Sequence, residues 1–351
     1  MCDCLVALGP ATKAGKTLFA KSSDRPPHEA QDLLWSASRV DTGPVRVTHI
    51  EIEPHAGPTL GALVSRPRWC WGAEHGVNEA GVAIGNETIY TTLDPRPFPP
   101  ALIGMDLVRL GLERASSAAD AIEVMTGLLE RFRQGGSGHV GVDRAYWSSF
   151  LVADPLDAWV LETSGATWTA EQVGPDQLDV RAISNRTTIP SFDAAHRHPS
   201  QPVEVLVDPR WQRSQVVLAE RPVTIDAVKS HLRSHGESLG SEPAVAGSDG
   251  GWTVCMHVEG VEGTTASLIA ELATNGPHVA HCLLGSPCRS LWVPVVVGEP
   301  LGHVPAWERF AALTDEHAPA LRSLEAVLVA ERPAAVDAFG AVDRLLSELA
   351  R

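Results

Sequence analysis

The chain has 351 residues, of which 44% are hydrophobic and 20% are charged. This is an ordinary globular composition with enough apolar material for a substantial core. The formal net charge of -15 would repel phosphate backbones and anionic lipid, so nucleic acid and membrane surfaces are disfavoured as partners. The sequence has no apolar run of about 18 residues, and its first residues do not have the features of a signal peptide, so we expect a cytoplasmic protein.

Cysteine and histidine spacing does not indicate a metal site. Six cysteines lie at positions 2, 4, 70, 255, 282 and 288. This spacing fits neither a dense disulfide framework nor a paired CxxC zinc site, so most are expected to be free thiols. His196 and His198 alternate in a polar stretch, but no HExxH motif accompanies them. The sequence therefore predicts neither a metal nor a cofactor.

The first 24 residues predict a β-hairpin. Residues 4–8 are apolar, residues 9–16 contain turn-forming glycine and proline, and residues 17–21 can form the return strand. Further strand-like segments follow at residues 45–53, 59–64 and 82–89. The first third of the chain is therefore expected to be rich in β-structure.

Two amphipathic helices are predicted next. Residues 105–114 carry apolar side chains at helical spacing on one face. Ser117 stands three residues before Asp120, a pattern typical of a helix start. The apolar stripe of this second helix continues to Phe132.

The rest of the chain returns to strands and ends in a helical tail. The predicted strands are residues 149–153, 158–162, 180–184, 265–272 and 279–284. Two β-rich blocks separated by a helical pair predict one α/β domain, of antiparallel sheets covered by helices, over residues 2–300. Residues 301–351, which are rich in alanine and leucine, are expected to form a C-terminal helical extension packed on that domain.

The second residue is the candidate catalytic centre. A small residue after Met1 normally permits removal of the initiator methionine, which would leave Cys2 with both a thiol and a free α-amine. An α-amine has a pKa of about 7.7–8.0, so near neutrality it can act as the base that activates the thiol. Met-Cys at a chain start is by itself more often a frayed end, but the residues around it favour the catalytic interpretation.

Several stretches of the chain carry a family resemblance. They read CDCLVA at residues 2–7, FAKSSDRP at 19–26, SRPRWCWGAE at 65–74, GNE at 85–87, LIGMDLVRLGLER at 102–114, AWVLET at 158–163, ISN at 183–185, TTAS at 264–267 and RS at 289–290. In this order they resemble the secernin and dipeptidase family of N-terminal-nucleophile cysteine hydrolases, distant relatives of penicillin V acylase and bile salt hydrolase. The similarity covers residues 2–295.

The resemblance implies an αββα sandwich, two stacked antiparallel sheets between helical layers, with Cys2 as the nucleophile. Cys4, on the same strand face, is the internal rival but has no free amine of its own. Lys21 and Asp24 would flank the nucleophile, because a cation favours the thiolate and a carboxylate can orient the amine. The alternative for these two residues is a solvated pair at a turn.

Two asparagines correspond in order to the family's oxyanion and positioning residues. They are Asn86, within GNE, and Asn185, at the end of ISN. Acyl transfer needs donors aimed at the developing oxyanion, which an asparagine amide can supply. Asparagines beside glycine or serine are otherwise common in turns.

Candidate substrate-binding residues lie in two places. Trp69, Trp71 and Glu74 form an aromatic and acidic group, expected either to line a substrate pocket or to pack in the core. Arg289 could bind a substrate carboxylate, although a surface position is the default for an arginine.

The chain departs from the family at two positions near the expected site. Secernins commonly have asparagine at the position of Ser22 and tend to carry histidine at the position of Trp147, which is therefore a further candidate substrate-binding residue. The region from 190 to 250 and the tail after 300 are also shorter than in animal secernins. These differences bear on substrate choice rather than on the nucleophile.

The sequence thus predicts a cysteine amidohydrolase that cleaves a carbon–nitrogen bond of a small substrate, such as a dipeptide or an N-acyl amino acid, through a thioester on Cys2. Transfer of the same acyl group to another acceptor would make the protein an acyltransferase. A non-catalytic binding or regulatory protein on the same scaffold is the alternative from another class, and it would not need Cys2, Lys21, Asp24 and Asn185 together. The expected partner is a small amide or peptide, and a homo-oligomer is compatible with the sequence.

Overall fold

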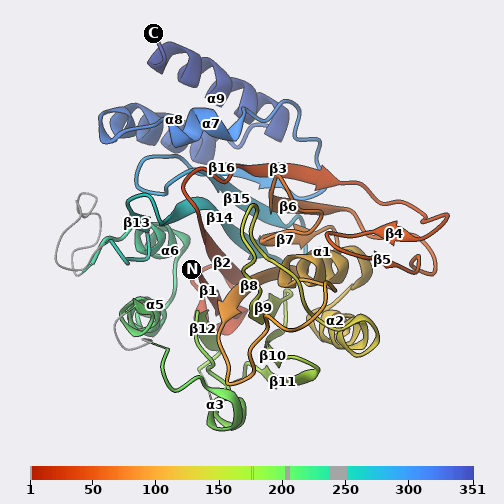
Figure 1. Ribbon diagram of the computed structural model, residues 1–351. Coiled ribbons are helices and arrows are strands. Elements are labelled where there is room, and N and C mark those ends of the chain that lie inside the picture. The colour runs from red at the N-terminus through yellow and green to blue at the C-terminus, as the bar shows by residue number, and fades with distance from the viewer. Residues whose placement is uncertain (1, 175, 177, 202–205, 237–250) are drawn as a thin grey trace.

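The computed structural model describes residues 2–174, 176, 178–201, 206–236 and 251–351. They fold into four layers in the order helix, sheet, sheet, helix (Figure 1). One outer layer contains α1 (Gly104–Arg114) and α2 (Ala118–Phe132). The other contains α5 (Asp208–Ala219) and α6 (Ile225–Leu232), and α3 (Pro190–His196) lies at the periphery.

The first sheet contains the N-terminal strand at an inner position. Its strand order is β12-β1-β2-β14-β15-β16, with β13 paired to β14, and all the pairings are antiparallel. The predicted hairpin is confirmed, with Cys2 opposite Ser23. The strand bounds are β1 (Cys2–Ala7), β2 (Thr17–Arg25), β12 (Val180–Ser184), β13 (His257–Val258), β14 (Glu262–Leu272), β15 (Val279–Leu284) and β16 (Val293–Val296).

The second sheet is also antiparallel, with strand order β11-β10-β9-β8-β7-β6-β3. Its strands are β3 (Gln31–Ser36), β6 (Ala62–Pro67), β7 (His75–Asn78), β8 (Ala83–Ile89), β9 (Trp147–Ala153), β10 (Ala158–Ser164) and β11 (Thr167–Gln172). The sequence patterns did not predict β3, β7 and β11. These strands mix polar and apolar residues without a long apolar run, so their pairing partners, rather than local composition, define them.

The single strand predicted at residues 45–53 is wrong. The chain forms a separate two-stranded ribbon there, of β4 (Val45–Arg46) and β5 (Glu51–Ile52). The reversal between them is closed by a hydrogen bond from Val47 N to Ile50 O of 3.0 Å. The apolar residues in this segment cover α1 instead of extending a sheet, since Val47 and Ile52 belong to the cluster beneath that helix.

Three apolar clusters hold the layers together, and they confirm the expected αββα sandwich. The first lies between the sheets and includes Phe19 and Leu63. The second packs α1 and α2 on the second sheet, and the third packs α5 and α6 on the first sheet. Burying an apolar side chain of this size contributes about 1.5–3 kcal/mol, which explains why the chain places both sheets back to back.

The C-terminal residues form three helices on the edge of the first sheet. They are α7 (Trp307–Ala311), α8 (Ala318–Glu331) and α9 (Ala335–Leu349), with short 3-10 turns at Gly9–Ala11 and Asp315–His317 elsewhere along the chain. Leu321, Leu328 and Phe339 from these helices join the cluster between the sheets. None of the helices in the described part of the chain has both the length and the apolar character needed to cross a membrane.

The start of α2 provides a test of the helix-capping prediction. Ser117 accepts a hydrogen bond from the Asp120 N–H at 3.1 Å, as its spacing predicted. We predict that Ser117→Ala lowers the free energy of unfolding by about 1 kcal/mol, because an N–H at the helix start loses its partner. Denaturant unfolding measures this difference. Ser323→Ala in α8 is the matched control, since that hydroxyl bonds only a carbonyl of its own helix and its loss should leave stability nearly unchanged; equal effects of the two changes would contradict the capping role.

Candidate active site

Cys2 is the first residue of the inner strand β1, and a small cavity opens beside it at this end of the first sheet. The residue is buried because β1 is flanked by β2 and β12 and covered by the second sheet. The cavity is lined by Cys2, Asp24, Arg25, Glu74, Asn86, Thr88, Tyr90, His139, Arg144, Tyr146, Asn185 and Glu262. Four of the five residues proposed as catalytic from the sequence therefore share one cavity, and the fifth, Lys21, lies immediately behind it.

The backbone nitrogen of Cys2, which would be the α-amine after removal of Met1, is held by Asn185. It donates to Asn185 Oδ1 at 2.8 Å. Asn185 follows the last residue of β12, and β12 pairs with β1, so sheet register alone brings this side chain to the Cys2 nitrogen. The amide nitrogen of Asn185 donates to Thr88 O at 3.0 Å, which fixes the orientation of the amide. Asn185 is therefore placed to orient an amine.

Arg210, from α5, supports this arrangement and was not predicted from the sequence. Its Nη2 lies 3.0 Å from Asn185 Oδ1, and its Nη1 lies 2.6 Å from Asp3 Oδ2 and 3.2 Å from Cys2 O. The guanidinium is almost completely buried. A buried arginine needs anionic or carbonyl partners to offset desolvation, and these three provide them. No local motif marks Arg210, because its role depends on α5 packing on β12.

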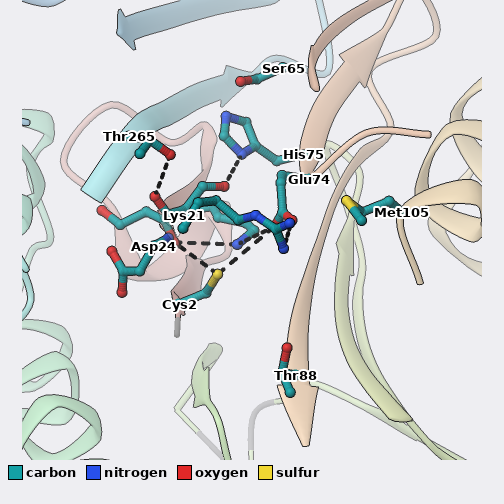
Figure 2. A network of polar contacts seen from close by, with 12 residues as sticks. Cys2, Lys21, Asp24, Ser65, Glu74, His75, Thr88, Met105 and Thr265 are labelled. Atoms are coloured by element: carbon teal, nitrogen blue, oxygen red, sulfur yellow. Dashed lines mark hydrogen bonds and ion pairs between the residues drawn. The ribbon is translucent and has the colours of Figure 1, made fainter. Parts of the chain in front are cut away.

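Asp24 lies on the opposite side of Cys2, on β2. Its backbone N–H points at Cys2 Sγ with a separation of 3.5 Å (Figure 2). Its Oδ1 accepts a hydrogen bond from Thr264 Oγ1 at 2.6 Å. Thr264 faces Asp24 across the pairing of β14 with β2. Burial raises the pKa of the Asp24 carboxyl to about 7, although the Arg210 charge acts in the opposite direction. The carboxyl can therefore change its charge near neutral pH.

A buried group of charges surrounds the thiol from the side of the second sheet. Glu74 Oε2 lies 3.9 Å from Cys2 Sγ and 3.7 Å from Lys21 Nζ (Figure 2). Glu74 Oε1 lies 3.3 Å from Arg25 Nη1. Lys21 also donates to Ser22 O at 3.3 Å. Glu74, expected as a pocket residue, is thus both a wall of the cavity and the anion that two buried cations share.

These surroundings determine the protonation of the nucleophile. Burial raises the pKa of the Cys2 thiol to about 12; the Lys21 cation lowers it and the Glu74 carboxylate raises it further. The burial effect exceeds the attraction of Lys21, so the resting group is a neutral thiol near pH 7. A thiol in this state needs a base before it can attack a carbonyl.

Asn86, on β8, also borders the cavity. When its amide nitrogen faces Glu74, it donates to Glu74 Oε2 at 3.2 Å and to Glu74 O at 3.0 Å. The backbone N–H of Asn86 donates to the same carbonyl at 3.2 Å. Asn86 therefore fixes the position of Glu74 beside the thiol, in addition to presenting an amide at the cavity wall.

Four residues proposed to bind substrate are not among the described residues that line this cavity. Trp69 donates to Glu29 Oε1 at 2.8 Å, and the ring of Trp71 stacks under the Arg109 guanidinium at 4.2 Å. Trp147 is fully buried between the sheets, where its Nε1 donates to Leu93 O at 2.8 Å. These contacts fit a packing role for the three tryptophans, because each one already contacts protein groups through its indole nitrogen or its ring.

Arg289 lies away from Cys2 and pairs with Asp315, with a separation of 2.9 Å. It lines a second, larger cavity of about 540 Å³ between β13, β14 and the start of the C-terminal helices. Glu262 borders both cavities, so the two are neighbours. Cys4, the rival nucleophile, belongs to the apolar cluster between the sheets and is not among the lining residues of the Cys2 cavity.

The segment between α2 and β9 contributes cavity residues that the sequence did not single out. His139 and Tyr146 are separated along the chain but meet edge-to-face, with ring centroids 6.1 Å apart. Burial lowers the pKa of His139 to about 2 and raises that of Tyr146, so both rings are neutral at physiological pH. The Gly138 carbonyl accepts from Arg25 Nη2 at 2.8 Å, which ties this segment to the charge network. Arg25 itself lies within the FAKSSDRP stretch, the one signal that could have identified it.

Part of the chain matches a known peptidase family. The model of peptidase family C69 matches residues 65–208, a range that contains Glu74, Asn86 and Asn185. The resemblance to the secernin and dipeptidase family is thereby confirmed. Among solved structures, penicillin V acylase from Agrobacterium tumefaciens is 14% identical, with a TM-score of 0.49 over 84% of this chain and 86% of that one. The C2A mutant of conjugated bile acid hydrolase from Clostridium perfringens is 11% identical, with a TM-score of 0.47 over 80% and 88%.

Removing the charge of Glu74 tests how this carboxylate controls the reactivity of Cys2. We predict that Glu74→Gln lowers the pKa of the Cys2 thiol, because it removes the nearby anion and leaves the Lys21 cation free to stabilise the thiolate. At a pH between 8 and 9, alkylation of Cys2 should become faster, by on the order of tenfold for one pKa unit. Peptide mass spectrometry after timed alkylation measures the rate. Glu53→Gln, an exposed carboxylate paired with Arg131, is the control and should leave the rate unchanged; an unchanged or slower rate in Glu74→Gln would contradict the assignment.

Proposed function

We propose that this relative of the C69 peptidases is a cysteine amidohydrolase that uses Cys2 as an N-terminal nucleophile on a small amide or peptide substrate. The match to a peptidase family supports hydrolysis of a carbon–nitrogen bond. The observation that carries the mechanism is the contact of 2.8 Å between the Cys2 nitrogen and Asn185 Oδ1. A side chain that orients the nitrogen of the nucleophile's own residue is expected when that nitrogen acts as the base.

The first step moves a proton within Cys2. With Met1 removed, the Cys2 amine accepts the proton of its own thiol, and Asn185 Oδ1 holds the amine in the required position. The N–H of Asp24, 3.5 Å from Sγ, stabilises the thiolate that forms. The Asp24 carboxyl lines the same cavity. When ionised, it favours the protonated form of the amine. The amine thus takes the part of the histidine in a catalytic triad.

The thiolate then attacks the substrate carbonyl, and negative charge develops on the carbonyl oxygen. We assign Asn86 as the donor to this oxyanion: its side chain borders the cavity beside Cys2, and one amide N–H exchanges its contact with Glu74 Oε2 for the oxyanion. The protonated amine of Cys2 returns its proton to the leaving nitrogen as the carbon–nitrogen bond breaks. A thioester on Cys2 remains, and a water molecule deprotonated by the same amine hydrolyses it to release the acid and the free thiol.

The charges at the cavity favour a dipeptide over an uncharged amide. Arg144 is exposed at the cavity and can pair with a substrate carboxylate. Glu262 borders the same cavity from β14 and offers a carboxylate to a substrate ammonium group. A free dipeptide carries one group of each sign at opposite ends. We therefore place its C-terminus toward Arg144, in the role first considered for Arg289, and its N-terminus toward Glu262.

The nucleophile is tested by comparing two neighbouring cysteines. We predict that Cys2→Ala lowers kcat for dipeptide hydrolysis by about 10⁴-fold or more, the scale on which loss of a catalytic nucleophile acts. Cys4→Ala is the matched control, because this thiol is equally buried on the same strand but lies in the apolar cluster. Intact-mass measurement should show active protein without Met1 and, after rapid quenching, a mass increase by one acyl group on Cys2. Full activity in Cys2→Ala, or an active form that retains Met1, would refute the mechanism.

The pH profile distinguishes a mechanism in which the Cys2 amine is the base from one in which the thiolate forms without a base. If the Cys2 amine is the base, kcat/KM should fall tenfold per pH unit below a pKa of about 7–8, where that amine becomes protonated, and level off above it. A thiolate formed without a base would instead give a rate that rises until the thiol pKa of about 12. Stopped-flow assays between pH 5 and pH 10 separate these cases, since continued increase above pH 9 would contradict the amine's role.

A further inference from the structure

Four side chains that commonly bind metals converge outside the Cys2 cavity. His235 follows α6, Cys255 precedes β13, His257 is the first residue of β13, and Cys288 lies between β15 and β16. Their ligand atoms all lie within 4.8 Å of one another. The separation from His257 Nε2 is 3.4 Å to Cys255 Sγ and 3.2 Å to Cys288 Sγ, and the two imidazole rings lie with their centroids 5.1 Å apart.

The two separations from His257 are close to the edges of a tetrahedron around one metal ion, and the other pairs of ligand atoms lie within 4.8 Å of each other. With Zn–S near 2.3 Å and Zn–N near 2.0–2.1 Å, neighbouring ligand atoms in a tetrahedral Cys₂His₂ site lie about 3.3–3.8 Å apart. Two thiolates also neutralise a divalent cation, which suits a site with two of its four residues buried. Sulfur and imidazole ligands select zinc over calcium or magnesium, which prefer oxygen.

We propose that His235, Cys255, His257 and Cys288 bind a structural Zn²⁺ ion. Four protein ligands complete the tetrahedron, so this site leaves no open position for substrate or water and is structural rather than catalytic. The ion would bind as the two thiols lose their protons to solvent. It would join three segments that are far apart in the sequence, at the C-terminal end of α6, at β13 and after β15.

The backbone around the cluster is already held in place. Cys255 N donates to Ser234 O at 3.0 Å, which fixes the segment of Cys255 beside that of His235. Arg322, from α8, donates to Cys288 O at 2.7 Å, and Arg233 donates to Pro287 O at 3.0 Å. Ligands held by contacts of this kind need little rearrangement on binding, which favours affinity for an ion.

The proposed ion would also act on the Cys2 site through a short chain of bonds. Met256 lies between two ligands, and its N–H donates to Thr264 Oγ1 at 2.9 Å. The Thr264 hydroxyl donates in turn to Asp24 Oδ1 at 2.6 Å. Loss of the ion should therefore loosen β13 and, through Thr264, the carboxyl beside the nucleophile. Thr264 is a positioning residue in this argument.

Two other states of these four side chains can be distinguished from bound zinc by experiment. A disulfide between Cys255 and Cys288 would remove both thiolates, although all six cysteines are free in this structure. A metal-free cluster held by hydrogen bonds would leave two thiols and two imidazoles in contact, with no affinity for a cation. Metal content, thiol titration and the spectrum of a substituted ion separate both states from bound zinc.

The experiment uses the full chain purified without chelator. Elemental analysis should find about one zinc per chain, and replacement by Co²⁺ should produce the intense visible bands of a tetrahedral ion together with sulfur-to-cobalt charge transfer. Cys288→Ser and His257→Ala should each reduce zinc content and abolish this spectrum. Cys282→Ser, a buried cysteine on β15 outside the cluster, is the matched control and should keep both.

Because a ligand variant could fail to fold, the wild-type chain is also tested by chelation. Removal of the ion from the wild-type chain should lower Tm, and added Zn²⁺ should restore it. The proposal is overturned if the folded chain binds less than about one-fifth of an equivalent of zinc after reconstitution, if Co²⁺ gives the weak spectrum of octahedral coordination, or if Cys255 and Cys288 are found joined by a disulfide. None of these readouts depends on activity, so the zinc site and the hydrolase mechanism can fail independently.

Discussion

β1 pairs with β2 on one side and with β12 on the other, and this pairing sets the environment of the Cys2 thiol. On the β2 side, the register places Asp24 next to the residue opposite Cys2. On the β12 side, Asn185 follows the residue that pairs with Asp3. A slip by one residue would turn every side chain of β1 to the other face, so the site and the core are specified by the same hydrogen bonds.

The charges around the thiol form a second constraint, because they lie where apolar packing would otherwise continue. Lys21, Arg25 and Glu74 are nearly inaccessible to solvent. An isolated buried charge is strongly unfavourable. Here the Glu74 carboxylate lies less than 4 Å from both the Lys21 and the Arg25 cation, so the opposite charges compensate one another. Removing Glu74 would deprive Lys21 of this carboxylate partner, whereas Arg25 would keep its ion pair with Glu29. Burial, acting against the attraction of Lys21, keeps the thiol protonated until a base acts on it.

The two sites inferred for this protein use cysteine in opposite ways. Cys2 is protonated because desolvation outweighs the attraction of Lys21, and its chemistry depends on a base of its own residue. Cys255 and Cys288 lie beside two imidazoles and could be stabilised as thiolates by a bound cation. The bonds through Met256 and Thr264 bring the second site into contact with the first. The fold thus places the candidate nucleophile at the start of β1, and the proposed zinc ligands Cys255 and Cys288 before β13 and between β15 and β16, which are strands of the same sheet.

The sequence by itself determined the hairpin that carries Cys2, the two amphipathic helices, most of the buried strands and the motifs that indicate the family. These features depend on local periodicity and on short segments, which a linear chain displays directly. The residues it singled out around the nucleophile were those inside such segments, including Asp24, Asn86 and Asn185. Only the tertiary structure decided that Arg210 supports Asn185, that Glu74 lies at the centre of the charges and that Trp147 packs in the core. It alone brought together His235 and Cys288, because contacts between distant segments depend on strand order and helix packing, which local pattern does not encode.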